Sequence, residues 1–227
     1  MSSPLVYALA FSAIAGALSL TAWRNGGPSV LLAWPATSSA VFAGAYLLRA
    51  PGLLGKTPEG RIARWAWLLH LPAFLATWGL WRLFARFRRG ACHEVAPGVW
   101  LGRRPFACDL PPGTQLVVDL TAEFPVDPAV QALAPVCFVP TLDGTAPDDR
   151  AALAALERAL ASPGPVYLHC AAGHGRSAAL AAAFLVRRGV CADLAAAEAH
   201  LRRLRPGVRL SRGQRALAAR LAVAASR

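Results

Sequence analysis

The chain has 227 residues, of which 56% are hydrophobic, and a formal net charge of +12 at pH 7. The hydrophobic share exceeds that of an ordinary soluble protein, which argues against a fully soluble chain. The charge does not indicate a nucleic-acid-binding protein, because neither interleaved aromatic residues nor a recognised binding fold accompanies it. A basic surface facing anionic headgroups or an anionic substrate explains it better.

Three apolar segments open the chain and predict membrane helices. Residues 2–23 and 26–48 carry no charged side chain, and residues 65–81 carry only His70 as a possible charge. Each segment is about long enough to cross a hydrocarbon layer of roughly 30 Å, the third only marginally. Six of the seven tryptophans lie before residue 82, and those at positions 23, 65 and 81 stand at the ends of the segments, as in the aromatic belts of membrane interfaces. We therefore expect residues 1–90 to form a membrane region with two to three hydrophobic helices.

The connection between the first two segments is only residues 24–27, so these segments are predicted to form a hairpin. Pro72 either kinks the third segment or marks it as an interfacial helix that lies along the bilayer. A cleaved signal peptide is the alternative for the first segment. It is disfavoured because residues 1–7 lack a basic start and a second apolar segment follows almost at once.

Residues 91–227 are predicted to form one soluble domain after a charged turn at residues 86–91. This length is ample for one hydrophobic core. Strands and helices alternate along it, which indicates an α/β layer fold with a small central sheet flanked by helices. The predicted strands cover residues 99–102, 116–120, 136–139 and 166–169, and the predicted helices cover residues 128–133, 148–161, 177–186, 193–204 and 211–224.

The stretch from His169 to Ser177, with the sequence HCAAGHGRS, lies between a predicted strand and a predicted helix. At a helix N-terminus, free backbone N–H groups and the positive end of the helix dipole both favour an anion. Gly173 and Gly175 are expected to supply the positive φ angles that such a loop requires. The sequence thus predicts a phosphate-binding loop whose residues are Ala171, Ala172, Gly173, His174, Gly175 and Arg176.

Cys170 lies at the start of this loop, where the same field lowers the pKa of a thiol and makes it an activated nucleophile. Arg176 offers a planar fork of donors that can grip two phosphate oxygens. Ser177 can give its hydroxyl proton to the sulfur as the sulfur departs. The alternative is an inert buried cysteine, which requires the whole residue set to coincide by chance with a strand-to-helix junction.

The pattern His-Cys-x5-Arg-Ser resembles the signature loop of the cysteine-dependent protein tyrosine phosphatase superfamily, and the domain around it resembles the dual-specificity class, as a bacterial, membrane-anchored member. Residues 117–124 are similar to a strand and turn of this class, and residues 139–143 to the segment that carries its general acid. Residues 205–210, followed by Gln214, resemble the turn before its last helix. The resemblance extends from about residue 95 to residue 223 and implies a dual-specificity phosphatase-like fold.

The resemblance also implies a two-step mechanism, in which Cys170 forms a phosphocysteine that water then hydrolyses, with no cofactor and no metal. Asp143 is the expected general acid and base, because its position in Pro-x-x-Asp matches that of the family. Asp148 and Asp149 are alternatives, although a helix N-cap or first turn explains both better. His169 is expected to support the loop and the thiolate, and a plain core histidine is the other interpretation.

The side chains of the loop indicate how many phosphate groups the substrate carries. Superfamily members that act on highly phosphorylated inositides often carry lysines in the loop, where this chain has Ala171, Ala172 and a mostly neutral His174. A substrate with one phosphate therefore fits better. It is either a phosphoprotein (tyrosine, serine or threonine) or a lipid phosphate such as phosphatidylglycerophosphate, on which a mitochondrial family member acts. Membrane attachment raises the local concentration of lipid phosphates but does not choose between the two.

Two other functions are compatible with parts of the pattern. The first is a catalytically silent phospho-binding module anchored at the membrane, against which the joint presence of Cys170, Arg176 and Asp143 argues. The second is a sulfurtransferase-like cysteine loop, which normally has a different spacing. Glu123 is explained equally well as a residue facing the site or as a solvated turn residue.

The expected location is the cell membrane, as a multi-pass protein whose catalytic domain faces the cytoplasm. The basic residues hardly decide this orientation, since five would lie inside and four outside with three crossings. A catalytic thiol survives best in a reducing compartment, and the other cysteines form no C-x-x-C pair. The expected partners are the membrane and a phosphorylated protein or lipid substrate, with no nucleic acid and with the oligomeric state left open.

Overall fold

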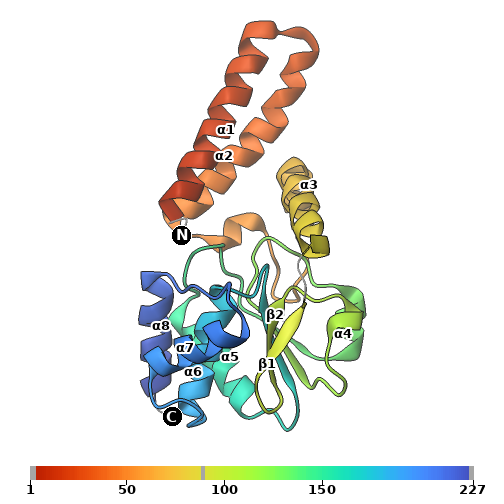
Figure 1. Cartoon of the computed structure of the whole chain (residues 1–227). Helices are drawn as coiled ribbons and strands as arrows, with labels where there is room; N and C mark the ends of the chain where they lie inside the picture. Colours follow the sequence, from red (N-terminus) through yellow and green to blue (C-terminus); the bar gives the residue numbers. More distant parts are fainter. Residues whose placement is uncertain (1–3, 88–89, 225–227) are drawn as a thin grey trace. The chain divides into compact units, whose positions relative to one another are not determined.

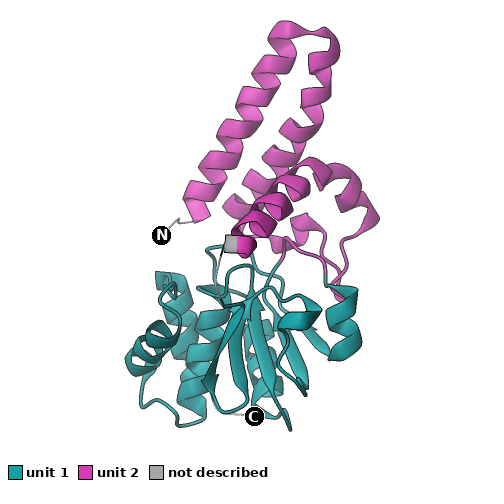
Figure 2. Cartoon of the chain, turned by 45° about the vertical axis from the view of Figure 1, so that its right-hand side comes forward, with its two compact units in different colours: residues 1, 88–121, 126–227 teal, residues 2–87, 122–125 magenta. Residues whose placement is uncertain are grey.

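The computed structural model describes residues 4–87 and 90–224 of the chain. It divides into two compact units, coloured separately in Figure 2. One unit comprises Arg88–Thr121 and Val126–Arg227, and the other comprises Ser2–Phe87 with Ala122–Pro125. We call them the sheet unit and the helical unit. The assignment of residues 1–90 to a membrane region and of 91–227 to a catalytic domain stays a prediction.

The helical unit contains α1 (Pro4–Asn25), α2 (Ala33–Leu48) and α3 (Arg64–Phe87), with short 3-10 helices η1 (Gly27–Leu32) and η2 (Pro51–Leu54). Figure 1 shows α1 and α2 side by side as a hairpin. Three helical stretches, Pro4–Asn25, Gly27–Leu48 and Arg64–Arg86, are long and apolar enough to cross a membrane by length and composition. The hairpin and the third apolar helix match the sequence-based prediction.

The helix α3 is longer than the sequence indicated. It continues beyond Trp81 to Phe87, with Pro72 inside it, so Arg86 lies in the last helical turn rather than in a charged turn. A positive side chain at this end is favoured by the helix dipole, which explains why the helix continues through it. Residues 88–89 of the predicted turn lie outside the described residues.

Aromatic rings and hydrogen bonds pack the interior of the helical unit. The rings of Tyr7 and Tyr46 stack with their centroids 4.9 Å apart, joining α1 to α2. His70 is fully buried on α3, where its Nδ1 lies 3.3 Å from Oγ of Ser38 and its Nε2 lies 3.0 Å from the carbonyl of Leu53. Both ring nitrogens are thus satisfied, as a buried polar group requires.

The segment Ala122–Pro125 belongs to the helical unit because tryptophans of α3 contact it. Nε1 of Trp78 donates a hydrogen bond of 2.8 Å to the carbonyl of Glu123, and the rings of Trp81 and Phe124 lie 5.5 Å apart. The Glu123 carboxylate accepts from the backbone N–H of Ala122 and is buried. The interpretation of Glu123 as a solvated turn residue is therefore wrong, because its side chain is enclosed and hydrogen-bonded.

The sheet unit contains five strands in the order β1-β2-β5-β3-β4. The pair β1–β2 is antiparallel, and the other neighbouring pairs are parallel. The strands are β1 (Cys92–Ala96), β2 (Val99–Arg103), β3 (Leu116–Asp119), β4 (Val136–Phe138) and β5 (Val166–Cys170). The helices are η3 (Ala107–Asp109), α4 (Pro128–Leu133), α5 (Asp149–Leu160), α6 (Arg176–Arg187), α7 (Leu194–Leu204) and α8 (Arg212–Val223).

The predicted α/β fold with a small flanked sheet is confirmed, and the elements predicted for the sheet unit match the observed ones to within a residue or two. The strand β1 was not predicted. It is a half-buried edge strand of mixed polarity, so neither strict alternation nor a continuous apolar run marks it. The turn at Pro97 and Gly98, where Gly98 has φ +73°, brings it back antiparallel to β2.

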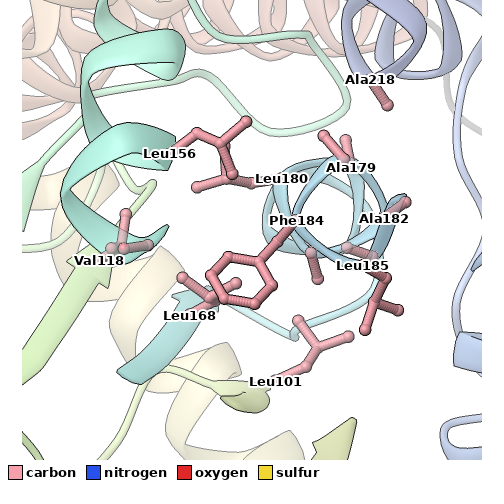
Figure 3. Close-up of a cluster of buried hydrophobic side chains, with 14 of the residues drawn as sticks. Leu101, Val118, Leu156, Leu168, Ala179, Leu180, Ala182, Phe184, Leu185 and Ala218 are labelled. Carbon is pink, nitrogen blue, oxygen red and sulfur yellow. The ribbon is translucent and has the colours of Figure 1, made fainter. Parts of the chain in front are cut away.

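The helix α6 is the centre of the core. Ten of its twelve residues are buried, and Figure 3 shows Phe184 directed at Leu168 of β5, near Leu101 of β2. Helix α6 packs against α8, α7 and α5 as well as the sheet. Burying a phenylalanine or leucine side chain contributes about 1.5–3 kcal/mol, so this packing fixes α6 firmly. Its N-terminus is thereby held at the end of β5.

Candidate active site

The site is built where the parallel strands end. The strands β2, β5 and β3 end at Arg103, Cys170 and Asp119, and their registers place these ends at one edge of the sheet. The chain then passes through the loop 171–175 and enters α6 at Arg176. The sequence HCAAGHGRS thus forms a strand-loop-helix unit in which the loop precedes a helix N-terminus, the arrangement that favours anion binding.

The two loop glycines serve different purposes. Gly173 has φ +74°, and a Cβ on it would collide with the carbonyl of Gly102 on β2. Gly175 has φ −125°, so the expectation of a positive φ at this position is wrong. A Cβ on Gly175 would lie only 3.1 Å from the amide group of Gln214. The physical reason for this glycine is therefore close packing against α8 and not backbone conformation.

The sulfur of Cys170 is buried and lies inside the loop. It accepts from the backbone N–H of Gly173 at 3.3 Å and from the hydroxyl of Ser177 at 3.4 Å. Burial raises the pKa of the Cys170 thiol, but the Arg176 guanidinium and the hydrogen bonds from Ser177 outweigh it and hold this pKa below its ordinary value. Such a thiol is a thiolate more readily than a free cysteine, as the sequence predicted.

The guanidinium of Arg176 is almost fully buried and is anchored by two backbone carbonyls. Its Nη1 donates to the carbonyl of Thr141 at 2.7 Å and to that of Leu120 at 3.3 Å. Its Nη2 lies 3.1 Å from Oδ1 of Asp143, whose side chain is half exposed. The structure therefore brings Asp143, Arg176 and Cys170 together, although 33 residues separate Asp143 from Arg176 in the sequence.

The two other aspartates of this region have different surroundings. Asp148 caps α5, since its Oδ1 accepts from the backbone N–H of Ala151 at 2.9 Å. Asp149 forms a two-point ion pair with Arg220 of α8, with N···O distances of 2.6 and 2.8 Å. Both carboxylates thus have structural partners at the start of α5, as their position in the sequence suggested.

His169 lies behind the loop and is buried. Its Nδ1 is 3.9 Å from Oδ1 of Asp119 and 3.4 Å from the carbonyl of Cys170. The same Asp119 oxygen accepts from the backbone N–H and from the hydroxyl of Thr121, at 2.8 and 2.6 Å. His169 therefore faces a carboxylate at the strand ends, a partner that the sequence analysis did not identify. An aspartate at the end of a neighbouring predicted strand is the signal that points to it.

Two further residues near the loop make contacts that the sequence did not predict. Arg205 is buried, and its guanidinium contacts the carbonyls of Ala172 and Gly173. Gln214 forms a capping box with Ser211 at the start of α8, and its Nε2 donates to the carbonyl of Thr145 at 2.9 Å. It thereby ties α8 to the segment that carries Asp143. Both residues lie in the segment after α7, which the family resemblance marked without giving these contacts.

The comparisons with known proteins agree with this geometry. A protein-family model described as "Polymorphic toxin system, DSP-PTPase phosphatase" matches residues 112–190, which include β3, Asp143, the loop and all of α6. The crystal structure of Tk-PTP in the active form has 25% sequence identity and a TM-score of 0.51, covering 60% of this chain and 98% of that one. The chain carries a dual-specificity-class domain of the cysteine-dependent protein tyrosine phosphatase superfamily.

A second solved structure shares the fold of this phosphatase domain. The crystal structure of PTPMT1 has 20% sequence identity and a TM-score of 0.50, covering 58% of this chain and 93% of that one. No curated protein sequence matches the chain. The matched structures lack a counterpart for about two fifths of the chain, which contains more than the phosphatase domain.

Proposed function

We propose that the protein is a membrane-anchored, cysteine-dependent phosphatase that hydrolyses phosphomonoesters through a phosphocysteine on Cys170. The observation that carries the proposal is the meeting of three groups at one helix N-terminus. A thiol with a lowered pKa lies in a loop of backbone N–H groups, and an anchored arginine fork beside it reaches the carboxylate of Asp143. These are a nucleophile, a phosphate-binding cradle and an acid, the parts that phosphoryl transfer to a thiol requires.

In the first step the Cys170 thiolate attacks phosphorus, and the S–P bond forms as the bond to the leaving oxygen breaks. Asp143 gives its proton to that oxygen, so the product leaves as a neutral alcohol. The loop N–H groups and the guanidinium of Arg176 stabilise the negative charge on the equatorial phosphate oxygens. This role fits the buried and doubly anchored position of Arg176, which keeps the fork oriented before substrate arrives.

In the second step a water molecule attacks the phosphocysteine. Asp143, now ionised, accepts a proton from the water, and the S–P bond breaks with its electron pair returning to sulfur. The hydroxyl of Ser177, 3.4 Å from Sγ, donates a hydrogen bond that stabilises the departing thiolate. His169 supports the loop from behind, beside Asp119. Inorganic phosphate is the second product.

The membrane anchor is proposed from the helical unit. Large apolar side chains such as Leu5, Leu9 and Leu20 on α1 are about half or more exposed, and in water such a surface is unfavourable. A bilayer accommodates it, with the phosphatase domain on the cytoplasmic side. The substrate is then a phosphoprotein or a lipid phosphate such as phosphatidylglycerophosphate. The uncharged Ala171 and Ala172 of the loop favour a single phosphate without neighbouring ones.

The test is phosphate release by the full-length protein in detergent micelles. The substrates are phosphatidylglycerophosphate, phosphatidic acid and a phosphotyrosine peptide. We expect Cys170→Ser to abolish turnover and Asp143→Asn to lower kcat by about 10²–10⁴-fold, the usual contribution of a general acid. Asp149→Asn is the matched control, because this carboxylate pairs with Arg220 and should leave kcat unchanged.

The outcomes distinguish a lipid phosphatase from a protein phosphatase, and an enzyme from a silent binding module. Preference for one of the lipids makes the protein a lipid phosphatase, and preference for the peptide makes it a tethered protein phosphatase. Equal loss of activity in Asp149→Asn and Asp143→Asn would contradict the assignment of the acid. Absence of turnover on all substrates, in the parent as in Cys170→Ser, would favour the silent phospho-binding module instead.

A further inference from the structure

The outer side of the phosphate-binding loop is held by a series of hydrogen bonds to its carbonyl groups. The backbone N–H of Arg104 donates to the carbonyl of Ala171 at 3.3 Å. At the other end of the loop, the backbone N–H of Arg209 donates to the carbonyl of His174 at 3.0 Å. The two carbonyls between these ends are those of residues 172 and 173, and both are held by one side chain.

That side chain is Arg205. Its Nη2 donates to the carbonyl of Ala172 at 2.8 Å, and its Nε donates to the carbonyl of Gly173 at 3.0 Å. The planar guanidinium presents these two donors at a fixed spacing, which matches two successive carbonyls of the loop. Arg205 thus holds the middle of the loop by a two-point contact.

The direction of a carbonyl determines the direction of the next N–H group. In a trans peptide unit the C=O and the following N–H point to opposite sides. When Arg205 holds the carbonyl of Ala172 outward, the N–H of Gly173 must point inward, and it lies 3.3 Å from Sγ of Cys170. By the same geometry, the carbonyl of Gly173 held outward turns the N–H of His174 inward.

Arg205 is itself held in place. It is 5% exposed and lies at the C-cap of α7, where its N–H donates to the carbonyl of Leu201 at 2.8 Å. Its Nη1 lies 3.1 Å from Nδ1 of His93 on β1. Burial and the nearby Arg205 charge lower the pKa of His93, which keeps this imidazole neutral and able to accept. The fork is therefore oriented before any phosphate binds.

We propose that Arg205 is a positioning residue of the phosphatase domain, which aims the N–H groups of Gly173 and His174 at the phosphate and the sulfur by holding the carbonyls of Ala172 and Gly173. It acts through the loop and does not touch the reacting atoms. The effect of Arg205 on kcat rests on the proposed function. Its effects on the pKa of the Cys170 thiol and on phosphate binding do not. A lysine cannot replace it, because a single ammonium group lacks the two donors at fixed spacing.

The experiment compares the full-length parent with Arg205→Lys and Arg205→Ala. Arg203→Ala is the matched control, because Arg203 is an exposed arginine of the same helix end whose side chain contacts His200. The first readout is the pH dependence of Cys170 alkylation by iodoacetamide, followed by mass spectrometry. The second is the protection of Cys170 from alkylation by inorganic phosphate, and the third is kcat and KM on an aryl phosphate.

We expect Arg205→Lys to shift the alkylation profile to higher pH, because loop N–H groups no longer stabilise the thiolate. Protection should need about tenfold more phosphate, and kcat should fall on the order of a hundredfold, as when preorganised donors are lost. The melting temperature of Arg205→Lys should stay near that of the parent, since charge and bulk are kept. If Arg205→Ala fails to fold, the comparison of Arg205→Lys with the parent is sufficient to test the proposal.

A parent-like alkylation profile and phosphate affinity in Arg205→Lys would overturn the proposal. It would also be overturned if Arg203→Ala shifted the profile as much as Arg205→Lys, because an exposed arginine whose side chain contacts His200 would then affect the thiol equally. A parent without turnover, whose alkylation profile still shifts in Arg205→Lys, would contradict the proposed function and leave the positioning role standing.

Discussion

Helices α1 and α6 have similar compositions and opposite surroundings. Both are rich in alanine and leucine, yet only Ala8 of α1 is buried, whereas ten of the twelve residues of α6 are buried. Helix α6 packs its apolar side chains against the sheet and three other helices of the same unit. The apolar side chains of α1 largely face outward, which fits a lipid environment. Composition therefore indicates that a helix needs an apolar partner, and packing shows whether the chain itself supplies it.

Truncating one large side chain on each helix should give very different losses of stability. Phe184 of α6 is 1% exposed and Leu9 of α1 is 61% exposed. We expect Phe184→Ala to lower the free energy of unfolding of the phosphatase domain by about 3–5 kcal/mol, because it leaves a cavity. Leu9→Ala should change it by less than about 0.5 kcal/mol. Urea unfolding of the full-length protein in detergent measures both, and equal losses would contradict the comparison.

The arginines at the ends of these helices offer the next contrast. Arg176 begins α6 and is buried beside Cys170, while Arg24 lies in the last turn of α1. Arg176→Ala should lower kcat/KM on an aryl phosphate roughly a thousandfold, about 4 kcal/mol of transition-state stabilisation. Arg24→Ala should leave it unchanged. A loss below about tenfold in Arg176→Ala would show that its fork does not hold the phosphate.

An added charge distinguishes an exposed position in lipid from one in water. Ile14 in the middle of α1 and Leu133 at the end of α4 are both exposed, at 47% and 61%. Ile14→Arg should disfavour membrane insertion by about 3 kcal/mol, the cost of an arginine at the centre of a membrane helix. Leu133→Arg should change stability by no more than about 0.5 kcal/mol. Resistance of the protein to carbonate extraction from membranes is the measurement, and unchanged extraction of Ile14→Arg would argue against α1 as a spanning helix.

Paired charges in the sheet unit give the smallest expected effect. Glu198 of α7 accepts two hydrogen bonds from Arg215 of α8, at 2.8 and 2.9 Å, and these with the Arg215 and Arg202 charges hold its pKa below the ordinary value. Because the pKa is lower in the folded state, the carboxylate stabilises the fold above the unfolded pKa, near 4.5. That contribution is lost as the pH falls through the folded pKa.

Substituting Glu198→Gln tests this account. Since Arg215 is 44% exposed, solvent screening limits the contribution of the pair, and we expect a loss of about 1 kcal/mol at pH 7. The difference in unfolding free energy between parent and variant should disappear in acid. A difference that persisted unchanged at low pH would show that packing, and not the ionised carboxylate, is responsible.

Local signals in the sequence were sufficient for most of the fold. The dipeptide Asp127-Pro128 gives a side-chain cap and a proline at the first helical position, and α4 begins there as expected. Cys170 and Arg176 belong to one short motif whose strand and helix are both strongly apolar. Their meeting follows from the chain path alone, since the loop connects them directly.

Contacts between segments that are distant in the chain could not be predicted from the sequence. The Nη1 atom of Arg205 meets His93 across 112 positions, and no spacing rule relates two such residues. The lack of room for a Cβ at Gly175 likewise comes from Gln214, which lies on α8. Long-range packing thus decides which polar groups around the loop are held, even where the loop itself is evident from the sequence.

Acid-quenched trapping with a ³²P-labelled aryl phosphate would show whether Cys170 carries the phosphoryl group during turnover. We predict that the label is bound covalently to the peptide containing Cys170 in the parent and is absent in Cys170→Ser. Cys137→Ser, which changes a thiol on β4, should label like the parent. Turnover without label on Cys170, or full activity in Cys170→Ser, would contradict the account.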